Sequence, residues 1–358
     1  MEWDGLEDQG EFVKVFLTGG AGYIGSHIAR ALGKSGYGVT IFDNLSTGHR
    51  SFTQGFKLVE GNLNDRLMLQ QHLPGHDAVI HCAARAYVSE SMIAPQSYYE
   101  TNIAGTLSLL DACLDAQIND FIFASSCSVY GSASNAPISE GHPLDPVSPY
   151  GFTKMAVERI LADYSRAYGI RHIILRYFNV AGADQTGDIG EYHAPETHLI
   201  PLAIAAAGGF SKELEIFGDN LSTPDGTCIR DYVHVSDLAD AHVLALRYLR
   251  ERRTNLTVNL GTGRGTSIFD VLAAIERETG CFVPRLIRAA RGGDPARIVA
   301  NCATARRTLR WSASSTFDDI VRSALRWSKV CATTACSGPN ALSKPAVLFS
   351  REALDCPS

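Results

Sequence analysis

Short apolar runs alternate with longer amphipathic segments through the first half of the chain. The runs predict buried strands at residues 12–18, 38–42, 56–60, 78–81, 121–125 and 172–177. The periodic segments predict helices, most clearly at residues 95–116 and 149–168. Fully apolar strands separated by helices are typical of a parallel sheet covered on both faces. We therefore expect an α/β fold with a doubly wound parallel sheet over residues 12–182.

This alternation stops near residue 182. Residues 183–230 are rich in glycine and proline, and helical patterns return at 236–250 and 268–279, with a strand at 256–260 between them. The second half therefore predicts a smaller α/β lobe. Residues 329–358 are rich in Ser, Ala, Pro and Cys without a clear period, and we expect a poorly ordered tail there.

Composition adds limits on partners and location. The chain has 358 residues, 45% of them hydrophobic, and a net charge of −6. Residues 1–11 form an acidic leader that carries most of this charge, so the remainder is nearly neutral and we expect no nucleic-acid partner. The chain contains neither a membrane-spanning apolar run nor a signal-peptide pattern at its start. Its nine cysteines are scattered, which favours a cytoplasmic protein with reduced thiols. The histidines match no common metal-binding motif, so we expect no metal site.

A glycine-rich turn follows the first expected strand. Gly19, Gly22 and Gly25 stand three residues apart where that strand leads into a helix. Glycines at this point allow backbone N–H groups to approach a pyrophosphate, and the helix N-terminus stabilises its charge. Asp43 directly follows the second expected strand, where a carboxylate can accept from a ribose 2′-OH, so the pattern favours NAD over NADP. The alternatives are a turn without a ligand, and Asp43 as a turn residue before Asn44.

Three further residues suggest proton transfer. Ser126 directly follows the fifth expected strand, at the edge where parallel sheets bind ligands. Tyr150 and Lys154 are four residues apart on a helix that Pro149 begins, so they share one face. A lysine and a nicotinamide cation near a tyrosine would lower its pKa and make it a general base. Taken alone, the Tyr-Lys spacing also fits an ordinary exposed helix pair.

Together these motifs resemble the extended short-chain dehydrogenase/reductase superfamily and, within it, the UDP-glucose 4-epimerase family and its near relatives. The matching stretches are 18–27, 42–45, 84–91, 98–106, 121–131, 148–154, 175–183, 217–235 and 291–294. The resemblance implies a Rossmann-like NAD-binding domain over 12–182, to which part of 231–263 returns. It assigns 183–230 and 264–328 to a nucleotide-sugar-binding lobe. It also implies a homodimer formed through the helices at 95–116 and 149–168.

The resemblance implies a role for individual residues. Ser126, Tyr150 and Lys154 would be catalytic. The NAD contacts would come from Gly19, Gly22, Tyr23, Ile24, Gly25, Asp43, Asn44, Asn62, Leu63, Asn102, Tyr150, Lys154 and Phe178. The UDP-sugar would contact Ser126, Tyr150, Asn179, Arg230, Arg291 and Asp294. Asn62 stands where the family usually has Asp, which implies a modestly altered affinity for NAD. Ile298 stands where some members have a bulky Tyr, so N-acetylated sugars could be admitted.

The activity implied is NAD-dependent 4-epimerisation of a UDP-sugar through a transient 4-keto sugar, with no net redox change. UDP-glucose and UDP-galactose are the first expectation, which would place the enzyme in galactose metabolism. UDP-xylose/UDP-arabinose, UDP-GlcNAc/GalNAc and UDP-glucuronate remain alternatives. A 4,6-dehydratase usually needs an acidic pair where this chain has Cys127 and Ser128. A non-catalytic NAD-sensing regulator would often lack the Tyr or the Lys, and both are present here.

Overall fold

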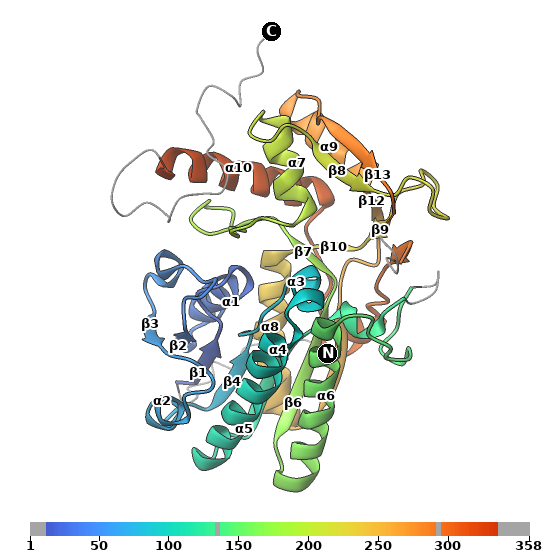
Figure 1. Ribbon diagram of the computed structural model, residues 1–358. Coiled ribbons are helices and arrows are strands. Elements are labelled where there is room, and N and C mark those ends of the chain that lie inside the picture. Colours follow the sequence, from blue (N-terminus) through green and yellow to red (C-terminus); the bar gives the residue numbers. More distant parts are fainter. Residues whose placement is uncertain (1–11, 133–136, 291–294, 336–358) are drawn as a thin grey trace, which may run out of the picture.

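The computed structural model describes residues 12–132, 137–290 and 295–335. Its main sheet has seven parallel strands in the order β11-β6-β5-β4-β1-β2-β3. The strands are β1 Lys14–Thr18, β2 Gly38–Asp43, β3 Lys57–Glu60, β4 Ala78–His81, β5 Asp120–Ser126, β6 Arg171–Tyr177 and β11 Leu256–Leu260. Figure 1 shows this sheet in the lower body of the molecule.

Helices cover both faces of the sheet, as expected for apolar strands. They are α1 Tyr23–Lys34, α2 Arg66–His72, α3 Val88–Ile93, α4 Pro95–Tyr98, α5 Gly105–Asp115, α6 Pro149–Tyr168 and α8 Val235–Arg252. Along β1, Val15 and Leu17 face a core shared with α1 and α8, whereas Phe16 faces a core shared with α5 and α6. The chain order of these elements gives the doubly wound arrangement predicted from the sequence.

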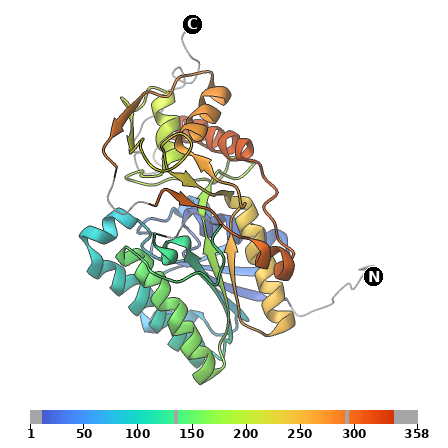
Figure 2. The ribbon, with the colours of Figure 1, turned by 90° about the vertical axis from the view of Figure 1, so that its right-hand side faces the viewer.

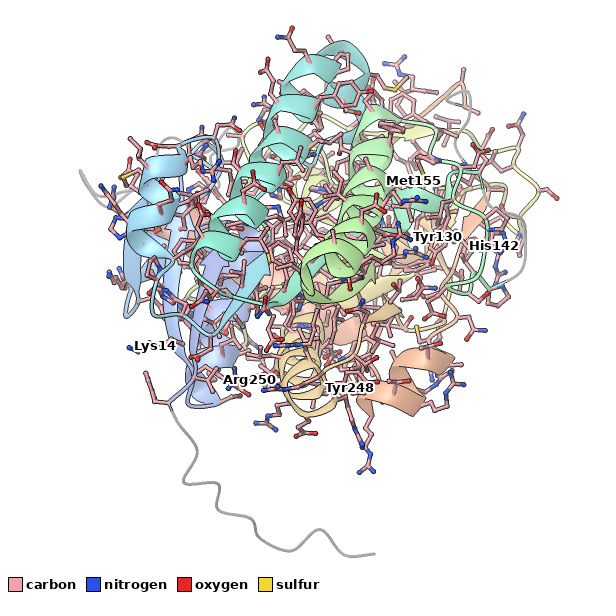
Figure 3. The ribbon with its side chains drawn as sticks, turned by 90° about the horizontal axis from the view of Figure 1, so that it is seen from below. Lys14, Tyr130, His142, Met155, Tyr248 and Arg250 are labelled. Atoms are coloured by element: carbon pink, nitrogen blue, oxygen red, sulfur yellow. The ribbon has the colours of Figure 1, made fainter. Side chains whose placement is uncertain are left out.

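The carboxyl end of the sheet faces a smaller lobe, drawn above it in Figures 1 and 2. This lobe contains α7 Leu199–Ala207, α9 Ile268–Thr279 and α10 Phe317–Ala335, with the parallel pair β8 Leu214–Phe217 and β13 Arg285–Arg288. These helices and strands share an apolar core of their own. Figure 3 looks from the opposite side, where Lys14 begins β1 and Arg250 lies near the end of α8.

Short strands connect the main sheet to the smaller lobe. β7 Asn179–Ala181, which comes after β6 in the chain, pairs in parallel with β10 Tyr232–His234. β9 Ile229–Arg230 lies between β12 Thr266–Ser267 and β14 Arg297–Ile298. The segment from 231 to 263 leaves the lobe, because α8 packs on α1 and β11 pairs with β6. Short 3₁₀ turns complete the main domain at Arg50–Thr53 and Cys127–Tyr130, and π-helical turns lie at Tyr99–Ala104 and Ala305–Leu309.

Two sequence expectations need correction. The helix predicted over 95–116 is interrupted by the π turn at Tyr99–Ala104, so it consists of α4, that turn and α5. The predicted start of the tail at 329 is wrong, because α10 continues to Ala335. Cys331 on this last part is buried with Phe52, Ile189 and Trp327, and this apolar cluster explains why the helix continues. The leader 1–11 and residues 336–358 lie outside the described residues.

Candidate functional site

The glycine turn joins β1 to α1 at the edge where the strand order reverses. Gly19 has φ +73°, and a Cβ there would lie 2.5 Å from the backbone N of Ala83, in the loop after β4. A Cβ on Gly25 would lie 2.1 Å from the Gly19 carbonyl oxygen. A Cβ on Gly22 would meet only that same oxygen, at 3.4 Å. Packing within the protein thus requires the first and last glycines, while the turn stays open at Gly22, which fits a pyrophosphate at the start of α1.

Asp43 holds this turn in place. Its carboxylate accepts hydrogen bonds from the backbone N–H of Ala21, at 3.0 Å, and of Leu45, at 2.8 Å. Burial raises the pKa of Asp43, and the two hydrogen bonds oppose that shift. Both carboxylate oxygens therefore already accept a backbone hydrogen bond, one from the glycine turn and one from the loop after β2. Each keeps a second lone pair, so the predicted ribose contact and the turn role are compatible.

Residues predicted to bind the adenosine end of NAD lie at the carboxyl ends of β2 and β3. Asn44 and Asn62 are exposed, and each side-chain oxygen accepts from the backbone N–H two residues later. Leu63 is buried beside this loop. Ile24 packs partly buried against the core under α1. The asparagines thus shape short loops while remaining accessible along the predicted cofactor edge.

Tyr23 connects the glycine turn to the second lobe. Its hydroxyl donates a 2.6 Å hydrogen bond to the carbonyl oxygen of Gly182. Burial raises the pKa of Tyr23 well above its usual range, and the carboxylates of Glu191 and Glu196 add to this. Tyr23 therefore stays protonated and available as a donor, so α1 remains attached to the loop after β7.

Ser126, Tyr150 and Lys154 come together where β5 ends and α6 begins. Ser148 caps α6 by accepting from the Gly151 N–H, and Pro149 occupies the first turn. A Cβ on Gly151 would lie 2.6 Å from the Ser128 carbonyl oxygen, so glycine lets the helix approach the turn after β5. This approach places the Tyr150 phenol near the Ser126 hydroxyl, which favours the phenolate, while that hydroxyl donates to Ser128 Oγ at 3.1 Å.

Lys154 lies one helical turn beyond Tyr150. Its buried ammonium donates a 2.7 Å hydrogen bond to the Ala124 carbonyl and lies 5.9 Å from the centre of the Tyr150 ring. Burial lowers the pKa of Lys154 to about 8, while Cys82 and Glu158 oppose the shift. The residues predicted to be catalytic thus form one group.

The expected lowering of the tyrosine pKa is not produced by the chain itself. Burial raises the pKa of Tyr150 to about 12, and the nearby Ser126 hydroxyl opposes this shift only in part. The cation of Lys154 is directed at the Ala124 carbonyl and does not form a hydrogen bond with the phenol. The prediction from the sequence was that Lys154 and a nicotinamide cation together would lower the pKa of Tyr150. The lysine alone does not offset the cost of burying a phenolate.

Asn102 is a buried link behind this group. Its amide group donates to the Arg85 carbonyl and to Thr153 Oγ1, both at 3.0 Å, and its oxygen accepts from the Arg85 N–H at 2.8 Å. It thereby joins the π turn to the loop after β4 and to α6. Besides its predicted contact with NAD, Asn102 therefore positions α6.

Phe178, predicted to contact NAD, is buried with Val129, Tyr130 and Ile298. Two described residues predicted to bind the UDP-sugar, Asn179 and Arg230, lie on the short strands β7 and β9. Asn179 begins β7, and its backbone N–H donates to the Asp231 carbonyl. Arg230 Nη1 donates to the carbonyls of Ile229 and Pro295. Arg291 and Asp294, the remaining predicted contacts, lie outside the described residues.

Two features were missed by the sequence reasoning. His81 is buried under the glycine turn, between the hydroxyls of Thr18 and Thr106 at 2.7 and 2.9 Å. Burial lowers the pKa of His81 to about 3, so it is neutral and can be donor to one hydroxyl and acceptor from the other. The second feature is a group of two glutamates and two histidines within 191–198. Its signal was the repeated Glu-x-His spacing in a loop.

The fold and the glycine turn define a dinucleotide-binding protein of the Rossmann type, and comparison with known proteins identifies the family. Residues 15–261 match the model of the NAD dependent epimerase/dehydratase family. The UDP-glucose 4-epimerase of Rhizobium leguminosarum bv. trifolii is 46% identical over 315 residues, which cover 87% of this chain and 96% of that protein. The chain therefore belongs to the NAD dependent epimerase/dehydratase family, and its cofactor is NAD.

Solved structures agree with this result. UDP-glucose 4-epimerase from Brucella ovis in complex with NAD has a TM-score of 0.85 and 50% identity, with 87% of this chain and 97% of that chain covered. The enzyme from Stenotrophomonas maltophila, with bound NAD and formylated UDP-arabinopyranose, has a TM-score of 0.86 and 38% identity, with 89% and 98% covered. In the described part of this chain, every helix is too short or too polar to span a bilayer.

Proposed function

We propose that this protein is an isomerase that interconverts UDP-sugars at C4 in an NAD-dependent reaction, with UDP-glucose and UDP-galactose as its substrates. One observation carries the proposal most directly. In a chain of this family, Ser126, Tyr150 and Lys154 gather at the carboxyl edge of the sheet: Ser126 favours the Tyr150 phenolate, and the Lys154 ammonium lies 5.9 Å from the centre of the Tyr150 ring.

The chain's residues would divide the work as follows. The turn at Gly19, Gly22 and Gly25 would hold the NAD pyrophosphate, and Asp43 would hold the ribose. When bound, NAD would supply the hydride chemistry at C4 of the sugar, by which a hydride is removed and then returned to the opposite face. Tyr150 would take the proton of the 4-hydroxyl and return it, with Ser126 as its hydrogen-bond partner. The transient product is a 4-keto sugar, and no net redox change results.

Two positive charges together, that of Lys154 and that of the nicotinamide ring of bound NAD, would allow Tyr150 to act as a base despite its high pKa. Burial opposes the phenolate, so a base at this position needs a cation close by. Lys154 supplies one, and it is held by the Ala124 carbonyl at a fixed distance from the ring.

Asn179 and Arg230, with Arg291 and Asp294, would hold the UDP group while the keto sugar turns between two orientations.

A conversion assay tests this proposal. Purified protein is mixed with UDP-galactose without added NAD, and the product is identified by chromatography. We expect UDP-glucose to form, because a cofactor that is reoxidised in each cycle need not leave the protein. The panel includes UDP-xylose, UDP-GlcNAc and UDP-glucuronate. N-acetylated sugars belong in it because the compact Ile298, 6% exposed, packs in the cluster of Phe178. Failure with every sugar would contradict the proposal.

We further propose a homodimer formed through α4, the π turn, α5 and α6. Tyr99 and Phe152 lie on two of these elements, are 40% and 42% exposed, and touch edge to face with centroids 6.1 Å apart. Exposed aromatic side chains that lie together on neighbouring helices support an interface. Light scattering should give twice the chain mass, and Phe152→Glu should shift the protein toward monomer. A monomeric wild-type protein would contradict this.

A cytoplasmic location completes the proposal. It rests on the odd number and scattered positions of the cysteines in the sequence. Fractionation of the native cell with antibodies to this chain is the direct test.

A further inference from the structure

Four side chains with metal-binding chemistry meet in the loop between β7 and α7. They are Glu191, His193, Glu196 and His198, and one ligand atom from each lies within 4.8 Å of all the others. The spacing differs from the helical and cysteine-containing motifs considered in the sequence. For this reason no metal site was predicted from the sequence.

The distances between these atoms fit a small metal ion. His198 Nδ1 lies 2.9 Å from Glu191 Oε1 and 3.1 Å from Glu196 Oε1. His193 Nδ1 lies 3.6 Å from Glu191 Oε1 and 3.5 Å from Glu196 Oε2. A tetrahedral ion with bonds of ~2.0–2.1 Å separates its ligand atoms by about 3.3–3.4 Å. The observed separations fall on both sides of that value, so small side-chain movements would complete the coordination.

The hydrogen bonding of the cluster is incomplete. His193 Nδ1 is buried and has no hydrogen-bond partner within the described residues, although both carboxylates face it. A buried polar atom without a partner is costly, and a cation placed between the two histidines and the two glutamates would satisfy it. We propose that Glu191, His193, Glu196 and His198 bind a divalent transition-metal ion of the Zn²⁺ class.

Neighbouring groups hold the ligands in position. The backbone N–H groups of Thr197 and His198 donate to Glu196 Oε1, at 2.7 and 2.8 Å. The ring of Tyr87 packs on His193 and His198, with centroids 5.7 and 6.4 Å apart. Fixed outer groups of this kind orient metal ligands. The His198 side chain is 51% exposed while that of Glu191 is 7% exposed, so an ion can enter from the His198 side.

The position of the site indicates its role. The Tyr23 ring lies 6.3 Å from that of His193, and Tyr23 stands in the glycine turn directly after Gly22. An ion bound here would fasten the loop that leads into α7 against both Tyr23 and Tyr87. The site is therefore structural: it fixes the second lobe relative to the dinucleotide turn, and the ion takes no part in the proposed epimerisation.

Metal content tests this proposal without any sugar substrate, so its result is independent of the assay for epimerase activity. The full chain is expressed with added zinc, purified in a thiol-free reducing buffer and gel-filtered, and zinc is measured by mass spectrometry. We expect about one zinc per wild-type chain, and at least a tenfold loss of affinity in His193→Gln and Glu196→Gln. His72→Gln, at the end of α2, is the matched control and should retain the metal.

A second measurement separates metal loss from misfolding. Zinc should raise the melting temperature of the wild type and of His72→Gln, but not that of His193→Gln, whose circular dichroism should match the wild type. Cobalt in place of zinc should give the visible absorption of a tetrahedral site without sulfur ligands. A wild-type chain that binds neither metal overturns the proposal, and so does unchanged binding in both ligand variants.

Discussion

The Lys154 ammonium lies 5.9 Å from the centre of the Tyr150 ring, yet its hydrogen bond goes to the Ala124 carbonyl. The backbone of β5 holds the Lys154 ammonium in place. Its charge therefore stays beside the Tyr150 ring without a hydrogen bond to the phenol. The arrangement supports Tyr150 as a proton donor and acceptor with Lys154 as its electrostatic partner. It also means that the two residues can be tested separately.

Removal of the Tyr150 hydroxyl should stop turnover while leaving the fold intact. We expect Tyr150→Phe to lower kcat for a UDP-sugar by about 10²–10⁴-fold, the usual contribution of a positioned acid–base group. Tyr168→Phe is the control, since Tyr168 ends the same helix and is 58% exposed. The NAD content after purification should be similar in both variants. A Tyr150→Phe enzyme with wild-type kcat would assign the base to another group.

The rate should fall on the alkaline side because Lys154 loses its charge. Burial lowers the pKa of Lys154 from 10.5 to about 8. The cation that favours the phenolate is therefore present below about pH 8 and is lost as the pH rises through that value. We expect kcat to decline above pH 8 in the wild type. Lys154→Arg keeps its charge, so any activity it retains should lack this decline. The same decline in that variant would exclude Lys154 as its source.

The sequence predicted the main sheet well because its strands are apolar on both faces and lie between periodic helices. α6, β4, β11 and α9 begin and end where the pattern placed them. The short strands β7, β9, β10, β12 and β14 were missed, since two or three residues carry no periodic signal. No part of α10 was predicted, and its C-terminal part is held by contacts with Phe52 and Ile189, far away in the sequence.

For the candidate site, the sequence could predict where some residues lie, while their roles stay predictions. Glycine spacing, the carboxyl end of a strand and the Tyr-Lys interval all report local geometry, so Gly19, Ser126 and Tyr150 could be found. The tertiary surroundings could not. That both oxygens of Asp43 bind backbone N–H groups, and that burial raises the pKa of Tyr150, depend on packing that no local pattern encodes.

A buried ion pair behind the site should be sensitive to the loss of one partner. Arg176 donates to both oxygens of Glu158, at 3.0 and 2.6 Å, and both side chains are 6% exposed. Arg176→Met would leave the Glu158 carboxylate buried without its cation, and we expect a loss of about 3–5 kcal/mol in unfolding free energy. The double variant Arg176→Met with Glu158→Leu should recover much of this. Urea unfolding measures all three proteins, and additive losses would show that the two residues do not interact.

Buried neutral histidines should make the protein sensitive to mild acid. Burial lowers the pKa of His81 to about 3 and that of His242 to about 4, whereas both would titrate near 6.5 in the unfolded chain. Below pH 6.5 the unfolded state therefore binds more protons, so stability falls as the pH decreases toward 4. Between pH 7 and 5, each such histidine should cost about 2 kcal/mol.

Urea unfolding at pH 7 and pH 5 measures this loss, and one substitution isolates the part due to His242. His242 lies between the Tyr177 hydroxyl, at 2.5 Å, and the Leu238 carbonyl, at 2.9 Å. His242→Gln can form the same kinds of hydrogen bond but does not titrate. It should be less stable than the wild type at pH 7 and should lose about 2 kcal/mol less on going to pH 5. If His242→Gln loses as much unfolding free energy between pH 7 and pH 5 as the wild type does, then His242 is neutral in the unfolded state at pH 5 or charged in the folded one.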